Sequence, residues 1–105
     1  MTDSVERLYD AVLEARDSDP VVSRTARLFR AGRSKIAKKL AEEAIEVVID
    51  AVNGDRNAVV RESADLLYHF LALLAASGVS LDDVAAELER RESRSGVEEK
   101  ASRPA

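Results

Sequence analysis

Two short acidic motifs in the sequence have the residue types and spacing to bind a metal ion. The first reads Glu-Glu-x-x-Glu at residues 42–46, and the second reads Glu-x-x-Asp at residues 62–65. Residues three apart lie on one side of a helix, so each motif would project a pair of carboxylates from one face. Oxygen-only ligand sets suit hard cations, Mg²⁺ or Mn²⁺, rather than zinc. The candidate metal ligands are Glu43, Glu46, Glu62 and Asp65.

Basic residues lie just before the first motif and complete a possible phosphate site. Protein-bound Mg²⁺ usually keeps several waters and is completed by substrate phosphates, so the acids point to a nucleotide or another phosphorylated substrate. Basic side chains would then bind the outer phosphates. The candidate phosphate-binding residues are Arg33, Lys35, Lys38 and Lys39.

The same residues have a purely structural interpretation, which the spacing alone leaves open. The acids could form a solvated face held by i,i+4 pairs between Lys38 and Glu42 and between Lys39 and Glu43. His69, the single histidine, follows Asp65 by four residues. We expect it to hydrogen-bond Asp65 and support the site rather than to act in catalysis.

Helices must position these groups, because apolar residues recur at helical spacing along most of the chain. We expect helices at about residues 4–16, 22–30, 34–52, 56–76 and 81–91. Ser34, Asp55 and Ser80 are the expected N-caps of the last three. Only about three residues join the third and fourth helices, so these should be antiparallel neighbours whose acidic pairs face each other.

The composition predicts one small all-α domain. The chain has 105 residues, 46% of them hydrophobic but only 4% aromatic, with four glycines and two prolines. This favours an aliphatic helical bundle of about five helices over a β-sandwich or barrel. The apolar arc of the third helix is about 220° wide, more than one packing face needs, so we expect homo-oligomerisation to complete the core. Residues 1–91 form the expected domain, and residues 92–105 an expected disordered polar tail.

Charge and residue usage exclude several function classes. A net charge of −4 argues against a general nucleic-acid partner, and the absence of cysteine excludes disulfides, thiolate zinc sites and cysteine nucleophiles. No apolar run approaches the roughly 18 residues that would span a membrane. The first residues lack the pattern of a signal peptide, so a cytoplasmic protein is expected.

Three blocks of the chain carry a family resemblance. They read GRSKIAKKLAEEAIEVV at residues 32–48, ESADLLYH at 62–69 and GVSLDDV at 78–84. In this order they resemble phosphoribosyl-ATP pyrophosphohydrolase, of the MazG-like all-α superfamily, over roughly residues 20–91. The resemblance implies Mg²⁺-dependent hydrolysis of the α–β phosphate linkage of phosphoribosyl-ATP. The products would be phosphoribosyl-AMP and pyrophosphate, in the second step of histidine biosynthesis.

The resemblance also implies roles for single residues. The four candidate metal ligands match the metal-binding acids of the family, and Lys35 and Lys39 match basic positions next to the phosphates. Glu42 matches the first acid of the family's Glu-Glu pair, which binds metal or orients water, and we expect Glu42 and Glu46 to be catalytic.

The chain departs from the family pattern at two places. Ala41 stands where many members have glycine, and Arg24 lies in a Ser-Arg-Thr stretch where many have Ser-Tyr-Thr. Two alternatives therefore stay open. One is a house-cleaning MazG-like pyrophosphohydrolase acting on another nucleoside triphosphate, and the other is a catalytically silent helical dimerisation module.

Overall fold

The computed structural model describes residues 2–92, and this part of the chain contains five α-helices and no strand. The helices are α1 (Thr2–Arg16), α2 (Arg24–Ala31), α3 (Arg33–Val52), α4 (Arg56–Ala76) and α5 (Leu81–Glu92). The predicted all-α class is confirmed, and every predicted helix end lies within two residues of the observed one. Glu92, assigned to the expected tail, is the last residue of α5, and the rest of that tail lies outside the described residues.

Side chains mark the start of α4 and α5 as predicted. The Asp55 carboxylate accepts a hydrogen bond of 3.1 Å from the backbone N–H of Ala58. At α5, the Ser80 hydroxyl accepts from the N–H of Asp83, and the Asp83 carboxylate accepts from the N–H of Ser80. This reciprocal capping box satisfies two backbone donors that the helix itself leaves unpaired.

The start of α3 differs from the prediction, because a single glycine joins α2 to α3. Gly32 has φ +102°, a left-handed conformation that suits a residue without Cβ, and no side chain caps α3. The Gly32 N–H bonds the carbonyl of Phe29, and its own carbonyl accepts from the N–H groups of Lys35 and Ile36. The predicted Ser34 cap is therefore wrong, and α2 turns directly into α3.

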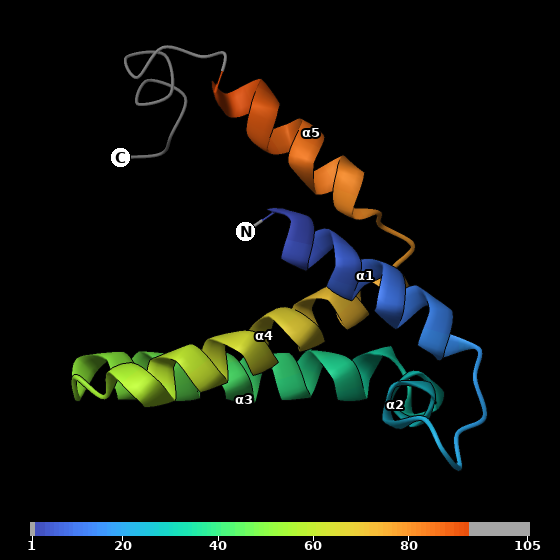
Figure 1. Cartoon of the computed structure of the whole chain (residues 1–105), viewed down its shortest axis with the longest axis horizontal. Helices are drawn as coiled ribbons and strands as arrows, with labels where there is room; N and C mark the ends of the chain where they lie inside the picture. The colour runs from blue at the N-terminus through green and yellow to red at the C-terminus, as the bar shows by residue number, and fades with distance from the viewer. Residues whose placement is uncertain (1, 93–105) are drawn as a thin grey trace.

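The long α3–α4 hairpin is the framework of the molecule, and the other helices are arranged around it (Figure 1). α3 and α4 lie side by side over most of their length, whereas α1 crosses the C-terminal half of α4 and α2 lies at the beginning of α3. α5 turns away from α4 by 105° and projects from the body. The acidic motifs lie on the two helices of the hairpin.

The core lies where α1, α2, α3 and α4 meet. Ile36, Leu71 and Ala72 have no exposed surface, and Tyr9, Val12, Leu28 and Ala75 complete the buried cluster. The Tyr9 hydroxyl donates a hydrogen bond of 2.9 Å to the carbonyl of Val79, which ties α1 to the α4–α5 connection. Apart from that aromatic ring the cluster is aliphatic, as the composition predicts.

Large apolar side chains remain exposed along the second half of α3. Ile45 is 60% exposed, Val48 61% and Val52 81%, although Ile36 in the first half is fully buried. α5 contains no buried residue. Within residues 2–92 no single helix is long and apolar enough to cross a membrane, and α4 and α5 meet the length and composition criteria only as a bent pair.

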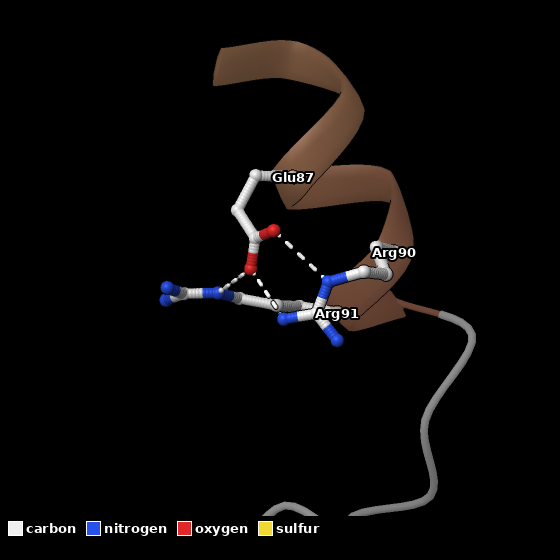
Figure 2. A network of polar contacts seen from close by, with 3 residues as sticks. All are labelled: Glu87, Arg90 and Arg91. Carbon is white, nitrogen blue, oxygen red and sulfur yellow. Dashed lines mark hydrogen bonds and ion pairs between the residues drawn. The ribbon is translucent and has the colours of Figure 1, made fainter. Parts of the chain in front are cut away.

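The polar side of α5 carries a three-residue charge network (Figure 2). The Glu87 carboxylate accepts hydrogen bonds from both Arg90 and Arg91, which follow it by three and four residues. A glutamate that precedes its basic partners at this spacing stabilises a helix. Hydrogen bonds from the two arginines lower the pKa of Glu87 to about 2 from its ordinary value of 4.5.

Glu87→Gln should therefore lower the melting temperature slightly at neutral pH, and the difference should vanish in acid. Because the folded-state pKa is depressed, the stabilisation is complete above about pH 4.5 and is lost as pH falls towards about 2. Melting curves of both proteins at pH 7 and near pH 2 measure this. Glu89→Gln, on the same helix, is the control. A difference that stays constant with pH would contradict the assignment.

Candidate metal centre

Three of the four predicted metal ligands converge between α3 and α4. One oxygen from each of Glu43, Glu62 and Asp65 lies within 4.8 Å of the other two. Glu43 and Glu62 are half-buried, and Asp65 is exposed. The antiparallel hairpin brings them together, because residues at the middle of α3 face residues in the first half of α4. Their separation in space is small enough for one cation to contact all three.

Glu46, the fourth predicted ligand, adjoins this group through Glu62. A side-chain hydrogen bond with Glu62, followed by repulsion from the charge of Glu62, raises the pKa of Glu46 above 4.5. Glu46 and Glu62 therefore repel each other when both are ionised, and a bound cation would relieve that repulsion. Glu46 also lines an open hollow with Ile49, Asp50 and Glu62.

The electrostatics of these acids favour a cation as their partner. Among residues 2–92, no lysine or arginine forms an ion pair with Glu43, Glu46, Glu62 or Asp65. The alternative based on Lys38–Glu42 and Lys39–Glu43 pairs is not observed in this part of the chain. Converging carboxylates without lysine or arginine partners repel one another, and a hard divalent cation bound by oxygens removes that repulsion. The donor set fits such an ion.

His69 supports the acid cluster from inside the fold. It is only 2% exposed, and its Nδ1 lies 3.0 Å from the backbone carbonyl oxygen of Asp65 and 3.5 Å from a carboxylate oxygen of Glu43. Both neighbours are acceptors, so Nδ1 carries the proton and donates. The expected hydrogen bond to Asp65 is present, but it reaches the backbone carbonyl rather than the carboxylate.

The remaining predicted residues divide into those near the cluster and those on the outside. Glu42 is exposed and lies outside the group of three, although its charge adds to the raised pKa of Glu46. Lys35 and Lys39 line a hollow between α2 and α3, whereas Arg33 and Lys38 are exposed and do not line it.

Two further basic residues line that hollow and were not among the predicted phosphate-binding residues. Arg24 and Arg27 on α2 line it together with Lys35, Lys39 and His69. Their spacing of three residues placed them on one helix face, which was the available signal. Only the turn at Gly32 sets this face against α3, so the residues could not be assigned without the structure.

Comparisons with known proteins agree on one family. The model of the family described as phosphoribosyl-ATP pyrophosphohydrolase matches residues 5–92. A protein named phosphoribosyl-ATP pyrophosphatase 2 from Rhodopseudomonas palustris is 66% identical, over 95% of this chain and 76% of its own length. Its namesake from Bradyrhizobium diazoefficiens is also 66% identical, over 100% of this chain and 78% of that protein. A phosphoribosyl-ATP pyrophosphatase from Gluconobacter oxydans is 52% identical, over 95% of this chain and 75% of its own length.

Proposed function

The chain belongs to the phosphoribosyl-ATP pyrophosphohydrolase family, and from this premise we propose how its residues carry out the reaction. It hydrolyses phosphoribosyl-ATP between the α- and β-phosphates to phosphoribosyl-AMP and pyrophosphate, the second step of histidine biosynthesis. The observation that supports this function best is the convergence of Glu43, Glu62 and Asp65 within 4.8 Å on the α3–α4 hairpin. Both the triphosphate and the carboxylates are negatively charged. A bound cation would therefore reduce the repulsion within the cluster and also allow the triphosphate to approach it.

The acid cluster would hold Mg²⁺, with Mn²⁺ as a substitute. Glu43, Glu62 and Asp65 would be direct ligands, and Glu46, whose pKa is raised by the neighbouring Glu62, would be the fourth. Bound Mg²⁺ supplies positive charge that offsets the charge on the triphosphate and on the leaving pyrophosphate.

The carboxylates that remain free would manage the proton of the attacking water. Glu42 is exposed and outside the group of three ligands, so its carboxylate is available as a general base. Glu46 is the second candidate if it does not bind the metal, because a raised pKa makes a carboxylate a better proton acceptor near neutral pH. His69 would hold Glu43 in place through its Nδ1–H. Lys35 and Lys39, with Arg33 and Lys38 farther out, would bind the outer phosphates.

The function is tested by measuring pyrophosphate release from phosphoribosyl-ATP with Mg²⁺ and with excess chelator. We expect rapid release with Mg²⁺ and loss of release with chelator, restored by added Mg²⁺. A panel of nucleoside triphosphates is the control for substrate choice, and faster release from one of them would favour the house-cleaning alternative. A folded sample that releases nothing from any substrate, and whose melting temperature is unchanged by Mg²⁺ or Mn²⁺, would be a silent module.

The exposed apolar face of α3 supports a homo-oligomer, a dimer or larger. Ile45, Val48, Ile49 and Val52 are each more than half exposed, and they follow one another along the outer side of the hairpin. A second copy of the chain would cover them and complete the core. A cytoplasmic location accompanies this proposal, since the substrate is a small phosphorylated metabolite.

A further inference from the structure

A basic hollow of about 230 Å³ lies between α2 and the first half of α3. Its walls contain four cationic side chains and no carboxylate. The residues that line it are Arg24, Arg27, Leu28, Ala31, Lys35, Lys39 and His69. Four positive charges around one small space repel one another, so this hollow favours an anion.

The cations of the hollow are not neutralised by acidic neighbours. In the described part of the chain, none of Arg24, Arg27, Lys35 and Lys39 forms an ion pair with a carboxylate. Arg27 is held at one end, since its Nη1 donates to the carbonyls of Pro20 and Val21 at 2.8 and 3.3 Å. A guanidinium has five N–H donors, so these two bonds leave others for a ligand.

Arg24 is positioned by an aromatic ring. Its guanidinium carbon lies 5.6 Å from the centre of the Tyr68 ring, within the range of a cation–π contact. Tyr68 is itself fixed, because its hydroxyl shares a hydrogen bond of 2.7 Å with Thr25 and its ring meets His69 edge-on at 5.0 Å. This contact places the planar fork of Arg24 at the ring of Tyr68, and a planar guanidinium suits a phosphate group.

The hollow lies along the same helix as the acid cluster but at some distance from it. Lys35, Lys39 and Glu43 follow one another at intervals of four residues, so they lie along one face of α3. At a rise of about 1.5 Å per residue, Lys39 is about 6 Å and Lys35 about 12 Å from Glu43 along the axis. A ligand that contacts both the cluster and Arg24 must have the length of a nucleotide rather than of one phosphate group.

We propose that Arg24, together with Arg27, Lys35 and Lys39, binds a phosphate group of the substrate away from the bond that is cleaved, and that Arg24 thereby helps to select the substrate. The proposal rests on the proposed function, which supplies a substrate with two phosphorylated ends. One end is the outer part of the triphosphate, and the other is the 5′-phosphate of the ribosyl group. Both present the same chemistry to the hollow.

The test measures equilibrium binding of the two products by calorimetry in the presence of Mg²⁺. Pyrophosphate represents the outer phosphates, and phosphoribosyl-AMP carries the ribosyl phosphate. Arg24→Gln should weaken the binding of one product about tenfold, as expected for the loss of one charge-assisted hydrogen bond. Arg30→Gln, an exposed arginine on α2 that does not line the hollow, is the matched control.

The outcomes separate the two sources of the phosphate and can overturn the proposal. A loss confined to pyrophosphate assigns the hollow to the outer phosphates, and a loss confined to phosphoribosyl-AMP assigns it to the ribosyl phosphate. Unchanged affinities, equal losses in the Arg30 control, or no binding of either product to the unmodified protein would each overturn it. Arg24→Lys keeps the charge but not the planar stacking, so partial rescue supports the positioning by Tyr68.

Binding is measured without turnover, so the proposal and the proposed function can fail separately. If product binding depends on Arg24 but the protein does not cleave phosphoribosyl-ATP, the phosphate site in the hollow is supported and the proposed reaction is contradicted. If the protein cleaves phosphoribosyl-ATP but Arg24→Gln leaves the product affinities unchanged, the reaction is supported and the phosphate site in the hollow is contradicted. Melting curves of each variant establish that it is folded before its affinity is compared.

Discussion

Glu62→Gln is expected to lower kcat/KM for phosphoribosyl-ATP by about 100- to 1,000-fold, in line with the several kcal/mol that a catalytic cation contributes. Glu62 is the residue that links the group of three to Glu46, so one substitution removes a ligand and the partner of a second. Glutamine keeps the shape of the side chain but loses its charge. The rates of the variant and of the unmodified enzyme over a range of Mg²⁺ concentrations measure the effect.

The same substitution should leave the fold intact or stabilise it. The pKa of Glu46 is raised by Glu62, which means that ionised Glu46 is disfavoured in the folded state and that stability falls as pH rises through the raised pKa. Removing the charge of Glu62 relieves this at neutral pH. We expect an unchanged or higher melting temperature without metal and a smaller rise on adding Mg²⁺. Glu14→Gln, an exposed acid on α1, is the control, and full activity in Glu62→Gln would remove the residue from the site.

His69→Leu is expected to lower kcat/KM by about 10- to 100-fold and to raise the Mg²⁺ concentration needed for half-maximal activity. Groups that orient a metal ligand commonly contribute effects of this size. The Nδ1–H of His69 faces the Glu43 carboxylate at 3.5 Å, and leucine fills a similar buried volume without a donor. Activity measured against Mg²⁺ concentration tests the prediction.

His69→Asn is the matched variant for this prediction. Its amide can place a donor near the position of Nδ1, so it should retain more Mg²⁺ affinity than the leucine variant. A purely structural role for His69 would predict lower melting temperatures for both variants and no change in the dependence on Mg²⁺. That result would contradict the assignment.

The sequence predicted the hairpin and its acids because both depend on local rules. Helical spacing, the Asp55 cap and the short connection specify α3 and α4 as antiparallel neighbours, and spacings of three residues put the acids on their facing sides. The acceptor of His69 was less predictable. A helical side chain leans towards the preceding turn, which brings the ring to the backbone carbonyl of Asp65 rather than to its carboxylate.

The parts of the site that were not predictable depend on contacts between distant segments. A serine two residues after a glycine is a reasonable N-cap, but the left-handed conformation of Gly32 lets α3 begin earlier. The same turn sets Arg24 and Arg27 against α3, and no local pattern specifies its direction. The wide apolar face of α3 predicted that a second surface covers it. Because this face is exposed in the single chain, a second copy of the chain as the covering partner stays a prediction.

The short connection between α3 and α4 also has a kinetic consequence. Only Asn53, Gly54 and Asp55 separate the two helices, so bringing them together costs little loop-closure entropy, and local contacts of this kind form early in folding. We therefore expect the repulsion among the clustered acids to be present already at the rate-limiting step of folding. Neutralising one of them should then speed refolding more than it slows unfolding. On this expectation, the charges that serve the reaction also slow the folding of the chain.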